Sequence, residues 1–219
     1  MPSPRSTRLR FSARWRAAVT VTLALVSAGL LAGCGSTSDP TPAAAAASTS
    51  RAVALARAEA IQGAVRRWAG SKTLADAKAA AEQARNLVTG PSVAGAGDGD
   101  HDANVEAVRI GLLPGADGSR GLASSIATGC VQSDVLGGSW SHPIQRWDDV
   151  ARRIRQWTPQ NNTFPGLPSH AQRVVGWASL TLASRRLSDA LEYSGHATGH
   201  ARVVVAAITN PAANPCPGA

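Results

Sequence analysis

Apolar residues recur at every third or fourth position over much of the chain, a spacing that predicts helices. The first such stripe lies between Arg51 and Gly70. A second begins after Thr73, which has Asp76 three residues on as a capping-box partner, and it stops at Gly90. The stripes consist of Leu55, Ala58, Ile61, Val65 and Trp68, and of Leu74, Ala77, Ala81, Ala84 and Leu87 or Val88. Because so short a turn joins them, we expect these two helices to form an antiparallel hairpin.

Residues 90–121 lack this periodicity and are rich in glycine, so they predict a long irregular loop. Within it, Asp102 is placed to cap a short helix from about Ala103 to Ile110. A further helix is expected from Leu122 to about Val135, and it would carry Cys130.

The clearest helical stripe comes next and consists of Ile144, Trp147, Val150, Ile154 and Trp157. Acidic residues stand near its start and arginines near its end, the order that the helix dipole favours. Tryptophans at stripe positions, such as Trp68 and Trp147, are expected to fill the core rather than to line a ligand groove.

Ser169 and Gln172 form another capping box, and the pattern from His170 to Thr209 is helical throughout. One straight helix of that length would measure about 60 Å, too long for a compact domain of this size. Gly195 and Gly199 are therefore the expected kink or break. Since no stretch alternates like a strand, the sequence predicts an all-α bundle of about five helices, spanning residues 51–210 and followed by a proline-rich tail, 211–219.

The N-terminal region has a different pattern. An apolar stretch from Ala17 to Leu31 follows five arginines and no acid, which is typical of a secretion signal. Leu31-Ala32-Gly33-Cys34 resembles the lipobox of bacterial lipoproteins. The resemblance implies cleavage before Cys34, which would carry a diacylglycerol, and removal of residues 1–33 as a signal peptide. The alternative is an uncleaved anchor helix with a chance cysteine.

The resemblance further implies a domain on the outer face of the cell membrane, held there by its acyl chains. Residues 34–50 would then be the lipidated cysteine and a flexible tether, because they are small, polar and without apolar periodicity.

Removal of the signal changes the charge. The whole chain has a net charge of +8, but the five signal arginines account for most of it, and 17 basic and 14 acidic residues remain. That balance gives no argument for nucleic acid as a partner. Of the three cysteines, Cys34 would carry lipid, and Cys130 and Cys216 would remain. Two cysteines in an oxidising compartment most often pair, so we expect a disulfide; free thiols or metal ligands are the alternatives.

Two clusters suggest metal ions. Glu192, His196 and His200 stand four residues apart on one helical face, close to Asp189, and could chelate zinc if the helix continues through the glycines. A polar helix face beside a kink is the alternative.

The second cluster is an acidic loop, in which Asp98, Asp100 and Asp102 alternate. Oxygen ligands on a pliable loop suit calcium, although Ala103 and Arg109 occupy positions that an EF-hand reserves for glycine and glutamate. The alternative is a solvated acidic loop whose last aspartate caps a helix.

No sequence motif for a catalytic nucleophile or a phosphate-binding loop is present. The sequence therefore favours a non-enzymatic lipoprotein with a binding or structural role at the cell surface and no cofactor. The alternative is a lipoprotein that binds calcium or zinc. Its ligand or protein partner is not encoded in any recognisable motif.

Overall fold

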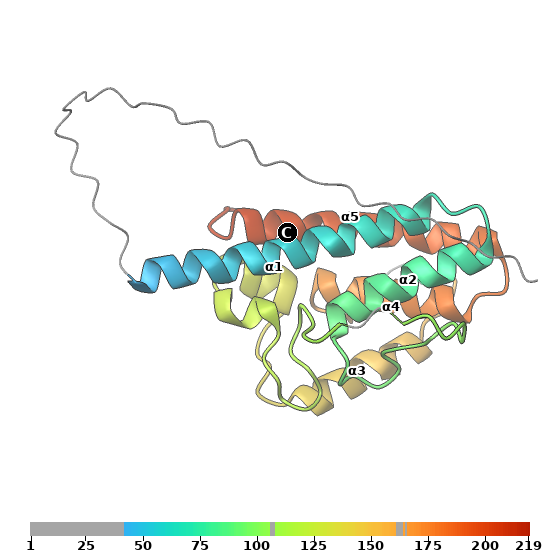
Figure 1. The fold of residues 1–219 in the computed structure, drawn as a ribbon, viewed down its shortest axis with the longest axis horizontal. Helices are drawn as coiled ribbons and strands as arrows, with labels where there is room; N and C mark the ends of the chain where they lie inside the picture. The colour runs from blue at the N-terminus through green and yellow to red at the C-terminus, as the bar shows by residue number, and fades with distance from the viewer. Residues whose placement is uncertain (1–41, 106–107, 161–163, 165) are drawn as a thin grey trace, which may run out of the picture. The chain divides into compact units, whose positions relative to one another are not determined.

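The computed structural model describes residues 42–105, 108–160, 164 and 166–219, which belong to one compact unit (Figure 1). These residues form helices and contain no β-strand, so the predicted all-α fold class is confirmed. The helices are α1 (Pro42–Ala69), α2 (Leu74–Thr89), η1 (Leu122–Ile126, a 3₁₀-helix), η2 (Val131–Leu136, a π-helical turn), α3 (Pro143–Arg155), α4 (His170–Ala183) and α5 (Leu187–Thr209).

Four helices form the bundle. α1 packs against α2 and α5, and α4 packs against the same two helices from the other side. α3 lies outside this group and packs against α4 (Figure 1). The largest fully buried side chains are Trp68, Trp177, Ile61, Leu112, Leu113, Leu167 and Ile208. Trp147 is also buried, as its stripe position predicted, and the indole N–H of Trp68 donates to the carbonyl of Ala190 (2.8 Å), which ties α1 to α5.

α1 begins earlier than expected. The predicted tether reached residue 50, but the helix already includes Pro42–Ser50. Five consecutive alanines, Ala43–Ala47, have the highest intrinsic helix propensity and need no packing partner to favour the helix. The hydroxyls of Ser48 and Thr49 both donate to the carbonyl of Ala45, so these polar residues stay within the helix. Apolar periodicity alone does not reveal such a helix.

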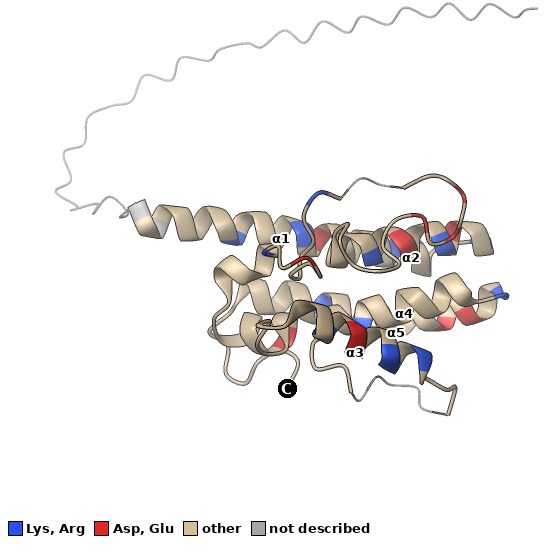
Figure 2. Ribbon diagram, turned by 90° about the horizontal axis from the view of Figure 1, so that it is seen from below, with Lys and Arg blue, Asp and Glu red and all other residues tan. Residues whose placement is uncertain are grey.

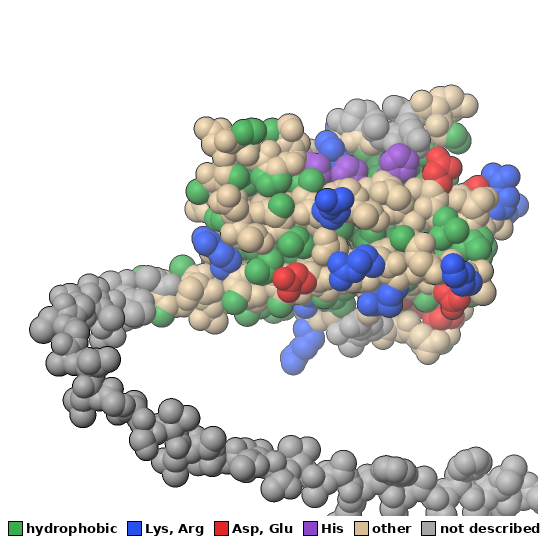
Figure 3. Space-filling view, turned by 90° about the horizontal axis from the view of Figure 1, so that it is seen from above, with side chains coloured by type: hydrophobic (Ala, Val, Ile, Leu, Met, Phe, Trp, Pro, Cys, Tyr) green, Lys and Arg blue, Asp and Glu red, His purple; other side chains and the backbone are tan. Residues whose placement is uncertain are grey.

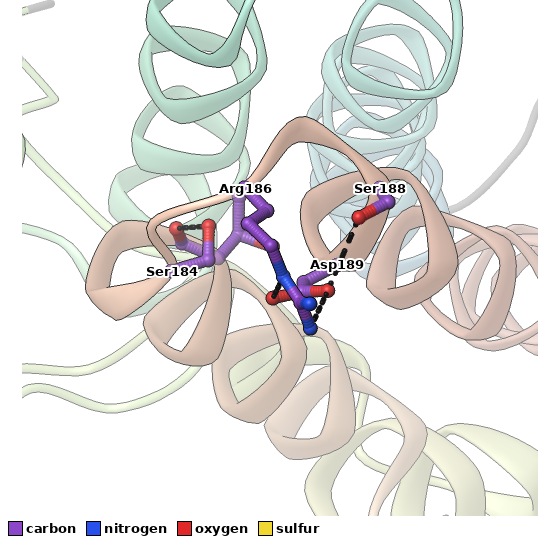
Figure 4. Close-up of polar contacts among 5 residues, drawn as sticks. Ser184, Arg186, Ser188 and Asp189 are labelled. Atoms are coloured by element: carbon purple, nitrogen blue, oxygen red, sulfur yellow. Dashed lines mark hydrogen bonds and ion pairs between the residues drawn. The ribbon is translucent and has the colours of Figure 1, made fainter.

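The break between α4 and α5 lies at Ser184–Arg186, so its expected position at Gly195 and Gly199 is wrong. Figure 4 shows the turn: the Arg186 side chain binds the carboxylate of Asp189 (2.9 Å), and Ser184 donates to the carbonyl of Thr181. Asp189 lies in the first turn of α5, where a negative charge favours the helix dipole. Because Arg186 is exposed, this ion pair contributes little to the stability of the fold.

The glycine-rich segment follows an irregular path, as predicted, but the short helix expected from Ala103 to Ile110 is absent from its described residues. Ala103 has a φ of +64°, which a right-handed helix does not accommodate. Asp102 also bonds to the N–H of Asn104, two residues on, and not to a helical N–H. The expected helix start is therefore a tight turn.

The later part of this segment completes α2. The amides of Leu112 and Leu113 donate to the carbonyls of Leu87 and Val88, at 3.1 and 3.0 Å. These carbonyls belong to the last turn of α2 and accept no hydrogen bond from an amide of the helix itself. Leu112 and Leu113 enter the core at the same place, so backbone bonding and apolar burial fix the segment together.

The helix predicted from Leu122 to Val135 is split into η1 and η2, with Cys130 immediately before η2. η1 ends at Ile126, and Gly129, with a φ of +48°, turns the chain before η2 begins. Cys130 and Cys216 form the expected disulfide, with Cα atoms 5.3 Å apart. Two hydrogen bonds also hold the tail. The amide of Gly218 donates to the carboxylate of Asp134 in η2, and the amide of Cys130 donates to the carbonyl of Pro211. The proline-rich tail is therefore fixed at three points.

The arginines predicted at the end of α3 lie in its last turn (Figure 2). The acidic residues expected near its start, Asp148 and Asp149, lie in the middle of the helix instead, and its first turn holds no acid. Trp147 and Val150 are buried, but Ile144, assigned to the same stripe, is 64% exposed. It stands in the first turn of the helix. None of the described helices is both long and apolar enough to cross a membrane.

Candidate functional site

A polar strip on α2 holds the glycine-rich loop. Asn86 donates to the carbonyl of Gly97 and accepts from its amide, at 3.1 and 3.2 Å. Arg85 donates to the same carbonyl (3.1 Å), and Glu82 accepts from the amides of Gly99 and Asp100. All three side chains are buried, with at most 8% exposed. Since buried polar groups require partners, this strip and the loop depend on each other.

The acidic loop lies next to this strip. One carboxylate oxygen from each of Glu82, Asp98 and Asp100 lies within 4.8 Å of the other two, the only such acidic, histidine or cysteine trio among the described residues. Burial raises the pKa of Glu82 and of Asp100, and the nearby charge of Arg85 opposes that shift at Glu82. Asp102 lies outside the trio, and its amide donates to both Asp98 and Asp100. The carboxylates that were predicted to bind calcium therefore also accept hydrogen bonds from the backbone of their own loop.

A cavity of about 410 Å³ lies between α2, α3 and α4, closed on one side by residues 92–96 of the loop. Its apolar wall includes Val93, Trp147, Val150, Ile154 and Val175. The indole N–H of Trp147 donates to the carbonyl of Pro114 (2.9 Å), so this wall is fixed against the glycine-rich segment. A larger hollow of about 690 Å³ at the α1–α2 turn is more open and is lined mainly by polar residues around Arg67 and Lys72. The half-open cavity between α2, α3 and α4 is the better-formed site.

The cavity carries a net positive lining. Arg85 and Arg155 line it, together with a single carboxylate, Asp148. Burial lowers the pKa of Arg85, and the negative charges of Glu82 and Asp100 partly oppose the shift. Arg155 is exposed and stands at the rim. No histidine or cysteine is among the described residues that line this space.

The histidines on α5 take two different environments. The helix is continuous through the glycines, as the predicted metal face required. The ring of His196 stacks on Trp177, with centroids 4.4 Å apart and planes 15° apart. His200 instead faces His170 of α4, with their Nδ1 atoms 3.0 Å apart. Glu192 is exposed, and the structure does not gather it with His196 and His200 into a three-ligand group.

The facing pair is electrically neutral at pH 7. Burial, together with the neighbouring His170, Arg173 and His196, lowers the pKa of His200 to about 3. Burial also lowers the pKa of His170, with Arg173 acting in the same direction and Asp134 in the opposite one. Two neutral rings can share one N–H between their Nδ1 atoms.

Several of these residues were missed by sequence reasoning. Glu82, Arg85 and Asn86 are spaced three and four residues apart on α2. Because they are polar and lie off its apolar stripe, nothing in the sequence indicated that they are buried. His170 was noted only as the start of a helix, because its partner is 30 residues away. Cys34, the predicted lipidation site, lies outside the described residues.

No protein-family model matches the chain, and no curated protein or solved structure matches it either.

Proposed function

We propose that this protein is a lipid-anchored, non-enzymatic binding protein of the cell exterior, which holds a small, mainly apolar anion between α2, α3 and α4. The observation that carries the proposal is the half-open cavity of about 410 Å³. Pockets for small molecules measure about 300–1,000 Å³ and combine apolar walls with a few polar groups. This cavity has both properties.

The charge of the lining supports an anionic ligand. The buried Arg85 and the exposed Arg155 outnumber the one carboxylate, Asp148. An anionic group that reaches Arg85 or Arg155 would gain a charge-assisted hydrogen bond, which is about twice as strong as a neutral one. The apolar part of the ligand would lie against Trp147 and Val150.

The cellular address has separate support. The segment Leu31-Ala32-Gly33-Cys34 resembles a lipobox, and a basic, apolar leader precedes it. The Cys130–Cys216 disulfide is of the kind that persists in oxidising compartments. A ligand site beside a membrane surface would meet apolar anions such as fatty acids.

Dye binding tests the cavity. We expect 1-anilinonaphthalene-8-sulfonate, an apolar sulfonate, to bind one site per chain and to be displaced by decanoate. Ala151→Trp places a large ring at a cavity-lining position of α3 and should weaken dye binding by about tenfold or more, or roughly 1.4 kcal/mol. Gln145→Trp, on the exposed side of the same helix, is the control and should leave it unchanged. Equal affinity in both variants would refute the cavity as a site.

The anionic preference has its own matched pair. Arg155 lines the cavity and Arg152, one turn earlier on α3, does not. Arg155→Gln should weaken decanoate but not decanol, whereas Arg152→Gln should affect neither. A loss of both ligands in Arg155→Gln would exclude a role for its charge.

The anchor is tested in cells. Labelled palmitate should enter the wild-type protein and not Cys34→Ala, and the variant should leave the membrane fraction. Labelling of both proteins would rule out Cys34 as the anchor while leaving the cavity result standing.

A further inference from the structure

The N-terminus of α4, the middle of α5 and the C-terminal tail meet at two facing histidines. His170 is the first residue of α4, and His200 lies on α5. Their ring centroids are 5.0 Å apart, their planes are inclined by 66°, and their Nδ1 atoms are separated by 3.0 Å. Figure 3 shows histidine side chains at the surface on one face of the bundle. His200 is half-buried and His170 is 9% exposed, so solvent reaches the pair from the His200 side. Neither histidine lines the cavity of the proposed function.

The other edge of the His170 ring is held by the tail. A Cβ on Gly218 would lie 2.5 Å from His170 Nε2 and 3.0 Å from Asp134 Cγ, so only glycine fits at this position. The amide of Gly218 donates to Asp134 (2.9 Å), and the Gly218 backbone also hydrogen-bonds the His170 ring. Because Nδ1 faces His200, this bond uses Nε2. The neutral His170 ring thus carries its proton on Nε2 and directs the Nδ1 lone pair at His200.

We propose that His170 and His200 bind a divalent first-row transition-metal ion, such as Zn²⁺ or Cu²⁺, through their two Nδ1 atoms. Metal–nitrogen bonds of about 2.0–2.1 Å place two tetrahedral nitrogen ligands about 3.3 Å apart. The observed 3.0 Å differs from that separation by only a few tenths of an ångström. Waters would fill the remaining positions, since His196 is stacked on Trp177.

The protons balance without an added acid or base. In the metal-free pair, His170 keeps its proton on Nε2 and His200 shares its Nδ1 proton with His170. When the ion binds, the His200 proton moves through solvent to Nε2, and both rings stay neutral. Imidazoles that are already neutral do not have to lose a proton to the solution before they bind a metal.

The surroundings are those of a supported ligand pair. The Gly218 backbone holds the His170 ring from behind, as carbonyls do for metal-bound histidines. Asp134 accepts from the Gly218 amide and adds a negative charge near the ring. Arg173 of α4 is the one nearby cation that opposes the ion, and His196 of α5 is the other titratable neighbour. Because the Cys130–Cys216 disulfide holds the tail in place, this support is present before any ion arrives.

Copper binding to the oxidised, full-length mature protein tests the proposal. We expect one Cu²⁺ per chain, with an electron paramagnetic resonance spectrum showing two coordinated nitrogens. His200→Ala and His170→Ala should each weaken binding by about a hundredfold, whereas His142→Ala, on an exposed residue before α3, should not change it. Equal binding by wild type, His170→Ala and His200→Ala would overturn the proposal.

A measurement on the wild type alone removes dependence on the variants. In ¹⁵N spectra, Zn²⁺ should shift the Nδ1 resonances of His170 and His200 and leave Nε2 protonated. Coordination through Nε2, or shifts confined to the other histidines, would refute the site even if His200→Ala fails to fold. Since the decanoate assay reports on a different surface, failure here leaves the proposed function untouched, and the converse holds.

Discussion

Glycine has opposite consequences in the 90–121 segment and in α5. At Gly121 a Cβ would lie 2.2 Å from the carbonyl carbon of Leu113, and at Gly111 it would lie 2.5 Å from that of Thr89. At Gly195 and Gly199 of α5 it would meet nothing within 4 Å. Gly111 and Gly121 therefore allow two backbone segments to lie in close contact, whereas Gly195 and Gly199 lie on an open helix surface.

The difference teaches that the irregular segment is the more constrained of the two at its glycines. Leu112 and Leu113 bond to the last turn of α2, and Gly121 lets the chain pass close to their backbone. α5 is positioned by its opposite face, where Ala197, Ala201 and Val204 are buried against the bundle. A loop can therefore be fixed residue by residue while a regular helix tolerates substitution along one side.

Removing the disulfide should have the largest effect and separate the two regions. The tail after α5 depends on Cys216, whereas residues 90–121 contain no cysteine. The double variant Cys130→Ser/Cys216→Ser should lose about 4–5 kcal/mol of unfolding free energy, because the bond spans 86 residues. Denaturant unfolding measures the loss. In hydrogen exchange, the amide of Gly218 should lose protection and those of Leu112 and Leu113 should keep theirs; equal loss in both would contradict the distinction.

The next largest effect is expected at Gly121. Gly121→Ala must displace the backbone of Leu113, which carries a core side chain, so we expect a loss of about 3 kcal/mol. Gly118→Ala is the matched control in the same segment: its φ is +82° but nothing lies within 4 Å of the added carbon. Backbone strain alone should cost it about 1 kcal/mol. Thermal unfolding of both variants decides, and equal losses would show that contact with Leu113 is not the constraint.

Helices were more accessible to sequence reasoning than the contacts between them. The stripe through Leu55, Ile61 and Trp68 predicted the part of α1 after Arg51 correctly, because burial on one face determines that spacing, but it did not predict the turns before it. The position of the α4–α5 break was wrong, since glycine lowers helix stability by only about 1 kcal/mol and packing of α5 offsets that. A local penalty of this size does not decide a helix boundary by itself.

The sites were less predictable for a similar reason. His200 was expected to pair along its own helix with Glu192 and His196, because spacing reports only neighbours within a helix. Its partner, His170, is brought to it by the packing of α4 on α5. The Cys130–Cys216 pair was predicted correctly because the hypothesis that Cys34 carries lipid left only two cysteines to be matched.

A smaller effect is expected where a side chain, not the backbone, holds the glycine-rich segment. Asn86→Ala removes both hydrogen bonds to Gly97 and leaves the amide of Gly97 without that acceptor. We therefore expect the unfolding free energy to fall by about 2 kcal/mol. Proteolysis should also speed up within residues 97–105. Asn210→Ala, at an exposed position after α5, should be close to neutral. A neutral Asn86→Ala would mean that backbone contacts alone fix the loop.

The smallest effect has the opposite sign and lies in α5. Gly195→Ala and Gly199→Ala each place a methyl group in open space on a continuous helix, and neither glycine has the left-handed φ that would strain an alanine. Each should therefore raise the unfolding free energy by up to about 1 kcal/mol, because alanine loses less backbone entropy on folding. Thermal unfolding should show additive shifts in the double variant. A loss of stability in either variant would indicate that this face of α5 is covered by something in solution, and that its glycines resemble Gly121 after all.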